Sequence, residues 1–322
     1  MSIRLDRAFP RSFDNQLARG LTSPAGEGGS RRRDSKLTRV VFVDDPNHLR
    51  NGAPRGETVK DKVGRLLGFL REENTLEVDC QILESLSKLG TEAIPYLIEA
   101  ADDPHYLVRE TVVIILGKLG SDSRSVEVLG KALEDPDPLI RREAMNSLKK
   151  IDSSDRVTTM LAKALQDENE DIRLEAALAI GEIEQNTKPT LSALIEAFNK
   201  EPDRYTKLGM AKTIWEIAPE ESARVLPFLL EVLQNDKYAS ARATVGIVLR
   251  VDYRPELNSA FSILVSALAD EDPIVRHSIV VIMGKMGSKA VSTIPTLEVM
   301  SQYDPDDLVR EEAKVAVRKI RQ

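Results

Sequence analysis

The sequence has little cysteine and histidine and no long apolar run, and each shortage excludes a class of protein. The single cysteine, Cys80, cannot form an intramolecular disulfide or a cysteine metal cluster, which is typical of a reducing compartment. The three histidines show no zinc-binding spacing. No run approaches the roughly 18 apolar residues of a membrane span, and the N-terminal segment lacks the apolar core of a signal peptide. We therefore expect a cytoplasmic protein without an integral membrane segment, metal or cofactor.

Aromatic residues are also scarce, and the charge is unevenly distributed. Aromatics make up 4% of the 322 residues, whereas the hydrophobic total is 42%, so the core must be mainly aliphatic. Residues 1–58 contain 11 Lys and Arg against 7 Asp and Glu, a net charge of +4, and the remaining 34 against 45 give −11. Because an acidic array repels phosphate, this composition disfavours a nucleic-acid partner.

What the sequence does contain is an acidic and a basic residue six positions apart, repeated about every 32 to 35 residues. Glu201–Lys207 occupies one slot of this series with the same charges. The remaining pairs are Asp103–Arg109, Asp135–Arg141, Asp167–Arg173, Asp236–Arg242, Asp270–Arg276 and Asp304–Arg310. Self-similarity at a period of this size indicates a solenoid of stacked repeats.

Apolar positions within each unit predict a pair of helices. In residues 92–120 a first helix is interrupted at Asp102–Pro104, and a second helix ends at Gly120. We expect an all-α solenoid, a right-handed superhelix of about eight helix pairs over residues 59–322. Residues 1–58, with a Gly- and Ser-rich stretch at Gly20–Ser30, predict a flexible basic extension.

The repeated charges have a structural explanation. Asp137 is placed to cap the second helix of its unit, with Pro138 in the first turn. The repeated arginine lies inside that helix and is expected to meet the aspartate of its own or an adjacent repeat, forming a ladder. Glycines eight residues after the arginine predict a close approach of neighbouring helices; these are Gly117, Gly181 and Gly284.

These motifs resemble the HEAT-repeat family. Pro95, Pro227 and Pro295 stand 14 or 15 residues ahead of their arginines, as in the HEAT signature. The short period and the phrases DPHYLVRETVVIILGKLG and DPLIRREAMNSL resemble the HEAT-like subgroup named after phycobilisome bilin lyases. The resemblance covers about residues 59–322. The HEAT-type deoxyhypusine hydroxylases use His-Glu pairs to hold iron, and no such pair occurs here.

The resemblance implies a binding surface, and two functions stay open. The first is a non-catalytic scaffold or adaptor that holds a protein partner on the solenoid and on the basic extension. The alternative is a phycobilin lyase subunit or chromophore chaperone, with bilin as its ligand. Trp, Tyr and Arg dominate binding energy at interfaces, and they gather in the irregular repeats at 187–253 and in the extension. The candidate partner-binding residues are Arg204, Tyr205, Lys207, Trp215, Tyr238, Arg250 and Tyr253, with Arg31, Arg32 and Arg33.

Overall fold

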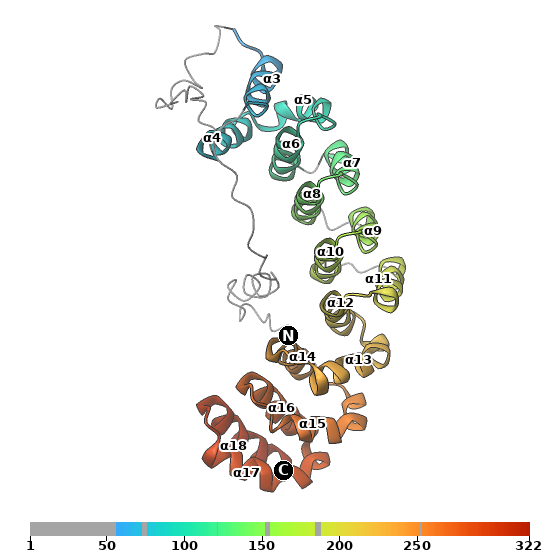
Figure 1. Ribbon diagram of the computed structural model, residues 1–322, viewed down its shortest axis with the longest axis vertical. Coiled ribbons are helices and arrows are strands. Elements are labelled where there is room, and N and C mark those ends of the chain that lie inside the picture. Colours follow the sequence, from blue (N-terminus) through green and yellow to red (C-terminus); the bar gives the residue numbers. More distant parts are fainter. Residues whose placement is uncertain (1–55, 73–75, 121, 152–154, 184–187, 252) are drawn as a thin grey trace, which may run out of the picture. The chain divides into compact units, whose positions relative to one another are not determined.

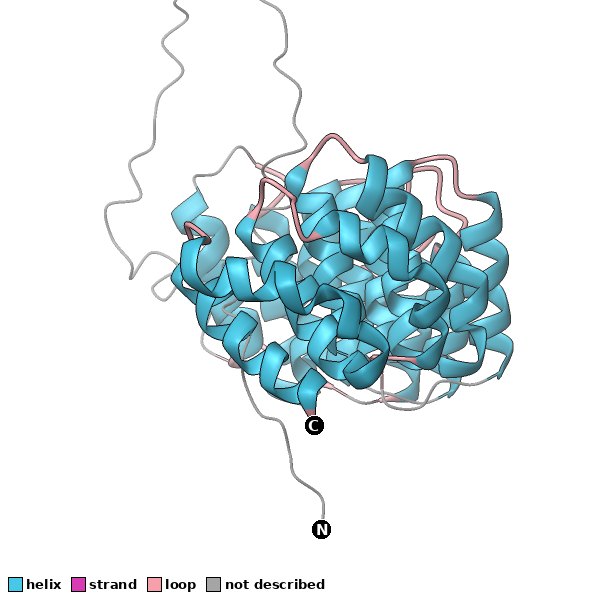
Figure 2. Cartoon of the chain, turned by 90° about the horizontal axis from the view of Figure 1, so that it is seen from below, coloured by secondary structure: helices cyan, strands magenta, loops and turns pink. Residues whose placement is uncertain are grey.

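Helices alternate along the whole described chain, and they form two rows. The computed structural model describes residues 56–72, 76–120, 122–151, 155–183, 188–251 and 253–322, and these contain no strand. Figures 1 and 2 show the first and second helices of the repeats as two packed layers. Eight pairs run from α3/α4 to α17/α18 within the described residues. These observations confirm the predicted all-α solenoid.

The helices have the following bounds. The first helices are α3 (Val59–Phe69), α5 (Ile94–Glu99), α7 (Ser123–Ala132), α9 (Asp155–Ala164), α11 (Lys188–Lys200), α13 (Ser222–Asn235), α15 (Phe261–Ala267) and α17 (Ile294–Tyr303). The second helices are α4 (Leu76–Ser87), α6 (Tyr106–Leu119), α8 (Pro138–Ile151), α10 (Glu170–Glu182), α12 (Arg204–Ile217), α14 (Ala239–Val251), α16 (Pro273–Met286) and α18 (Asp307–Arg321). Short 3-10 turns lead into some first helices; they are η1 (Gly90–Ala93), η2 (Pro219–Glu221), η3 (Pro255–Ala260) and η4 (Gly287–Thr293).

The described helices belong to one compact unit, Pro54–Gln322. Within it each second helix packs on the second helix of the next repeat, and these helices line the concave side of the unit (Figure 1). The predicted basic extension, including Arg31, Arg32 and Arg33, lies almost entirely outside the described residues and stays a prediction.

Capping side chains mark where five of the second helices begin, namely α8, α10, α12, α16 and α18. The Asn169 side chain accepts from the backbone N–H groups of Asp171 and Ile172, so α10 begins at Glu170. Asp137 accepts from Leu139 N at 2.9 Å, and Pro138 opens α8. Such caps satisfy donors that have no partner within the helix. In these repeats the second helix therefore starts a few residues after the acidic residue of the ladder.

Glycines allow the second helices to approach closely, as their positions predict. A Cβ added to Gly117 in α6 would lie 2.1 Å from Ser147 Oγ in α8 and 3.1 Å from its Cα. The corresponding distance from Gly181 to Thr213 Cγ2 is 3.0 Å, and from Gly284 to Ala316 Cα it is 3.2 Å. Since a real Cβ does not approach other atoms below about 3 Å, Gly117 is the position where a side chain is least tolerated.

Two glycine-to-alanine substitutions should therefore have opposite effects. Alanine is a better helix former than glycine by about 1 kcal/mol. Gly64→Ala in α3 should raise the urea midpoint, because nothing lies within 4 Å of the added Cβ. Gly117→Ala should lower it, because the clash with Ser147 costs about 1–3 kcal/mol. A Gly117→Ala protein as stable as the parent would contradict the close packing of α6 and α8.

Candidate functional site

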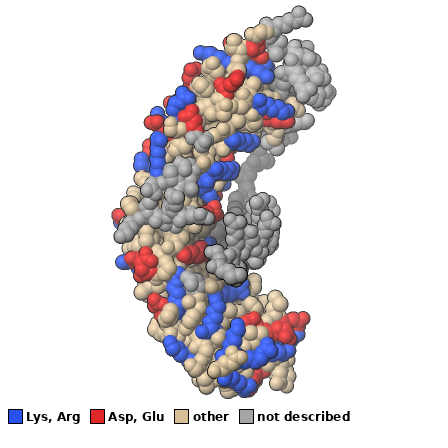
Figure 3. Space-filling view, turned by 180° about the vertical axis from the view of Figure 1, so that it is seen from behind, with Lys and Arg blue, Asp and Glu red and all other residues tan. Residues whose placement is uncertain are grey.

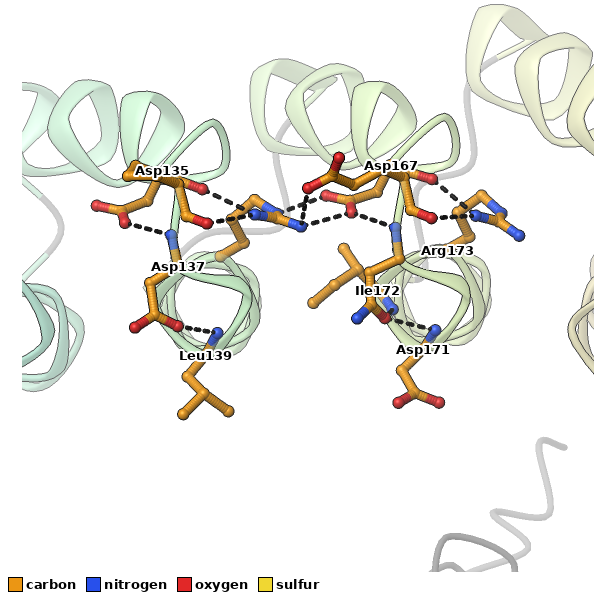
Figure 4. Close-up of polar contacts among 11 residues, drawn as sticks. Asp135, Asp137, Leu139, Asp167, Asp171, Ile172 and Arg173 are labelled. Carbon is orange, nitrogen blue, oxygen red and sulfur yellow. Dashed lines mark hydrogen bonds and ion pairs between the residues drawn. The ribbon is translucent and has the colours of Figure 1, made fainter. Parts of the chain in front are cut away.

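Each ladder arginine before the last, Arg310, links two consecutive repeats, and among the described residues Arg310 forms polar contacts only with Asp304 and Asp307 of its own repeat. Arg141 in α8 donates from Nε to Asp167 Oδ2 at 2.7 Å and from Nη2 to Oδ1 at 2.8 Å. Its Nη1 donates to the backbone oxygen of Asp135, in its own repeat, at 2.9 Å. Asp167 Oδ1 also accepts from Asn169 N at 2.8 Å, which holds the carboxylate in place (Figure 4). The side-chain partner of the arginine is thus the aspartate of the following repeat.

The same geometry recurs along the unit. The Nε atoms of the other internal ladder arginines lie 2.7 or 2.8 Å from a carboxylate oxygen of the next repeat. These pairs are Arg109–Asp135, Arg173–Glu201, Arg242–Asp270 and Arg276–Asp304. Paired hydrogen bonds to a carboxylate impose orientation as well as attraction. The ladder therefore determines the register of one repeat on the next.

One slot of the ladder differs from the sequence-based expectation. Lys207 was predicted to act as the basic member, and this is wrong. Arg204, one turn earlier in α12, donates from Nε to Asp236 Oδ2 at 2.7 Å. The Lys207 ammonium instead lies 5.0 Å from the Phe198 ring centre and 5.6 Å from that of Phe228. An ammonium lacks the planar pair of donors that an arginine offers to a carboxylate, and aromatic faces stabilise it instead.

Sequence reasoning also missed the first rung. Arg71, which follows α3, donates to Asp103 Oδ2 at 2.5 Å. Its repeat lacks the six-residue pair, so no charge spacing pointed to it. Arg204 was not recognised as a rung, because it stands three residues before the slot that the six-residue spacing assigned to Lys207.

Beside the ladder lies a small exposed aromatic patch, which we call the tyrosine patch and define as Tyr205, Lys237 and Tyr238. The two tyrosine rings are 5.9 Å apart, and the Lys237 ammonium lies 4.7 Å from the Tyr238 ring centre. Tyr238 is 48% exposed, and burial raises the pKa of the partly buried Tyr205. The patch stands where α12 and α14 begin.

Trp215 does not belong to any exposed surface. Its side chain is 0% exposed, and the Arg254 guanidinium stacks 4.3 Å from its ring centre. Arg254 also donates to the Trp215 backbone oxygen. The hypothesis that Trp215 contacts a partner is therefore wrong, because it is a core residue covered by the turn after α14.

The remaining candidates lie at the other end of α14. Arg250 Nη1 is 2.9 Å from His277 Nδ1 in α16, and the Tyr253 hydroxyl donates to Asn258 Oδ1 at 2.9 Å. A 13-residue helix separates them from Tyr238 by roughly 20 Å. The structure thus brings Arg204, Tyr205, Lys207 and Tyr238 together and leaves Arg250 and Tyr253 apart. Arg31, Arg32 and Arg33 lie outside the described residues.

Within the described residues, no group of three His, Cys, Asp or Glu side chains is placed to hold a metal ion. Among the same residues, no helix is long and apolar enough to cross a membrane.

Removing one rung should destabilise the protein strongly. The side chains of Arg141 and Asp167 are each 7% exposed, so Arg141→Ala leaves a buried carboxylate without its partner. We expect a loss of about 3 kcal/mol in the free energy of unfolding, measured by urea titration. Arg142→Ala is the control, because Arg142 is 38% exposed in its pair with Glu175 and should lose at most about 1 kcal/mol. Equal effects of the two substitutions would contradict the ladder.

Acid should weaken the rungs that contain Asp270 and Asp304. Burial raises the pKa of Asp270 and Asp304, but hydrogen bonds from Arg242, Arg276 and backbone N–H groups lower it below the ordinary 3.8. A carboxyl whose pKa is lower in the folded state contributes stability above its unfolded pKa, and that stability is lost as the pH falls through the folded value. The urea midpoint should therefore fall steadily once the pH drops below about 4. A constant midpoint from neutral pH to about pH 3 would rule out this contribution.

The sequence matches HEAT repeats over residues 64–149, 94–171, 126–215 and 226–318. No curated protein matches it. Among solved structures, the X-ray structure of Escherichia coli YibA is 19% identical with a TM-score of 0.60, covering 91% of this chain and 100% of that one. An engineered protein is 18% identical with a TM-score of 0.51, covering 82% and 80%. A chain in a homology model of the full-length AP-3 complex is 14% identical with a TM-score of 0.59, covering 82% and 52%.

At these identities the structural likeness shows the fold alone. None of the matches distinguishes the subgroup related to bilin lyases. Because the HEAT-repeat matches cover most of the chain, it belongs to the HEAT-repeat family.

Proposed function

We propose that this protein is a non-catalytic scaffold or adaptor that binds a protein partner on its second helices, with the tyrosine patch as the main contact. The observation that carries the proposal is the exposed Tyr238 ring beside Tyr205 and Lys237, at the edge of a ladder that holds α12 and α14 in register. Tyrosine supplies a large contact area with few rotatable bonds, and it is enriched at binding hot spots.

The ladder supports this function because it prepares the surface before the partner arrives. Arg204 contacts both Asp236 and Glu231, at 2.7 and 2.8 Å, so the turn that carries Tyr238 is tied to the start of α12. A contact surface that is already ordered avoids part of the entropy cost of binding. In this proposal the basic extension, with Arg31, Arg32 and Arg33, forms a second contact for an acidic region of the partner.

The bilin alternative gains no support from the described residues. A bilin-binding cleft would need aromatic side chains on its walls. The candidates for these walls were Tyr205, Trp215, Tyr238 and Tyr253. Trp215 is buried, and Tyr253 lies at the opposite end of α14 from Tyr238.

The tyrosine patch can be tested by partner capture. Full-length protein and the Tyr205→Ala, Tyr238→Ala double variant would be used to capture partners from lysate of the native cell, with quantitative mass spectrometry. We expect the dominant partner to fall at least about tenfold with the double variant, because hot-spot side chains carry most of the binding energy.

Tyr303→Ala is the matched control, because Tyr303 is 75% exposed in α17, away from the patch. It should leave capture unchanged, and circular dichroism should show the same helix content for all three proteins. Undiminished capture by the double variant would overturn the proposal.

A further inference from the structure

The C-terminal ends of the last three second helices carry cations that lack carboxylate partners. We define the basic edge as Arg250 in α14, Lys285 in α16, and Arg318 and Lys319 in α18. None of the four forms an ion pair within the described residues, although most ladder cations are paired. Lys285, Arg318 and Lys319 are exposed, and Arg250 is partly buried. In Figure 3, Lys and Arg side chains gather over the end of the unit formed by the last repeats.

Contacts place these cations beside one another. Lys285 Nζ donates to the Arg250 backbone oxygen at 2.6 Å, across the gap between α16 and α14. Lys319 Cδ would lie 3.5 Å from a Cβ added to Gly284, the neighbour of Lys285. The contact from Lys285 satisfies a carbonyl at the end of α14, which favours a cation there. It leaves the ammonium without a carboxylate, so the cluster keeps its positive charge.

Arg250 is a partly buried member of the edge that contacts a histidine and, among the described residues, no carboxylate. Its guanidinium contacts the ring of His277 at 2.9 Å, and Glu312 is the only carboxylate that raises its pKa. Burial, the larger cause, lowers the pKa of Arg250, and the guanidinium in turn helps to lower that of His277. A partly buried cation without a carboxylate contact favours an incoming anion.

A row of aliphatic side chains runs beside the basic edge. Ile247, Val281 and Val315 stand three or four residues before the cations of their helices and are only partly buried. Residues at this spacing share one face of a helix, so each of the three helices presents an apolar group next to a cation. The surface thus repeats the same pair of contacts once per helix.

The spacing of these contacts suits an extended peptide. Packed helices lie about 8–10 Å apart, so the backbone positions that carry each contact pair recur at about that distance, and the long side chains of Arg250 and Lys285 reach across it. A polyproline II segment has three residues per turn and a rise of about 3.1 Å, so every third residue recurs on the same side after about 9 Å. We propose that the basic edge binds an extended acidic segment of a protein partner, with a carboxylate at about every third residue and apolar residues between. This inference rests on the proposed scaffold function.

The same positions earlier in the array limit the length of this surface. Glu182 and Glu216 lie at the C-terminal ends of α10 and α12. They stand at the positions that Lys285 and Lys319 occupy in α16 and α18, and both are exposed. A long polyanion such as nucleic acid would meet these carboxylates, whereas a segment that crosses three helices would not. The observations therefore favour an acidic peptide.

The test uses full-length protein and a fluorescein-labelled (Glu-Pro-Val)4 peptide, followed by fluorescence anisotropy. Binding should be saturable and should weaken at least about tenfold when salt rises from about 50 to 300 mM. A double variant, Arg318→Glu with Lys319→Glu, should bind at least tenfold more weakly. Lys150→Glu is the matched control, because Lys150 is exposed at the same position of α8 without an ion pair to described residues, and it should bind normally.

Two further ligands test whether the basic edge recognises spaced carboxylates on a peptide. A peptide of the same composition with its glutamates in one block should bind more weakly, because only part of it can match the helix spacing. A single-stranded DNA oligomer should also bind more weakly than the peptide. Any of four results would overturn the inference. They are equal binding of the block peptide, tighter binding of DNA, no binding of (Glu-Pro-Val)4, and full affinity of the charge-reversed variant for (Glu-Pro-Val)4. If the peptide fails while the tyrosine variant still loses its partner, only the basic edge is refuted and the scaffold proposal stands.

Discussion

A guanidinium that reaches from one repeat to the carboxylate of the next is the contact on which the rest of this structure depends. In every internal rung except that of Arg204, the arginine holds its own turn through a backbone oxygen and the following turn through a side chain, as Arg276 does with Asp270 and Asp304. Both turns carry the caps that start the second helices. Register between repeats is thereby transmitted by oriented hydrogen bonds, and the aliphatic core supplies most of the driving force for packing.

This arrangement explains where a partner can bind. Most apolar side chains of the second helices pack on their neighbours, as the fully buried Trp215 does. What stays accessible lies at the two ends of these helices, with the tyrosine patch at the capped end and the basic edge at the other. The ladder holds each helix at a regular distance from the next, so the basic edge repeats once per helix over α14, α16 and α18. A partner that crosses these three helices would therefore meet the same chemistry at each step.

The fold followed from the sequence because its signals are local. These signals act within one repeat or between neighbouring repeats. They include the six-residue spacing of Asp135 and Arg141, the proline that follows Asp137, and Gly117. The spacing did not reveal which carboxylate each arginine would meet, because that depends on where the next turn falls in space. Lys207 was misassigned because the pattern treated lysine and arginine as equal charges. Trp215 was misassigned because residue type was used without knowledge of burial.

The central claim is that the rung, and not packing alone, couples neighbouring repeats. Hydrogen exchange of the Asp236→Asn variant, read by mass spectrometry, tests it most directly. Asp236 accepts from Arg204 at 2.7 Å and from Tyr238 N at 3.0 Å, so it joins α12 to the start of α14. Loss of its charge should accelerate exchange in both α12 and α14 while leaving α6 and α8 unchanged. Faster exchange in α14 alone would show that the rung does not couple the two repeats, and would contradict the account.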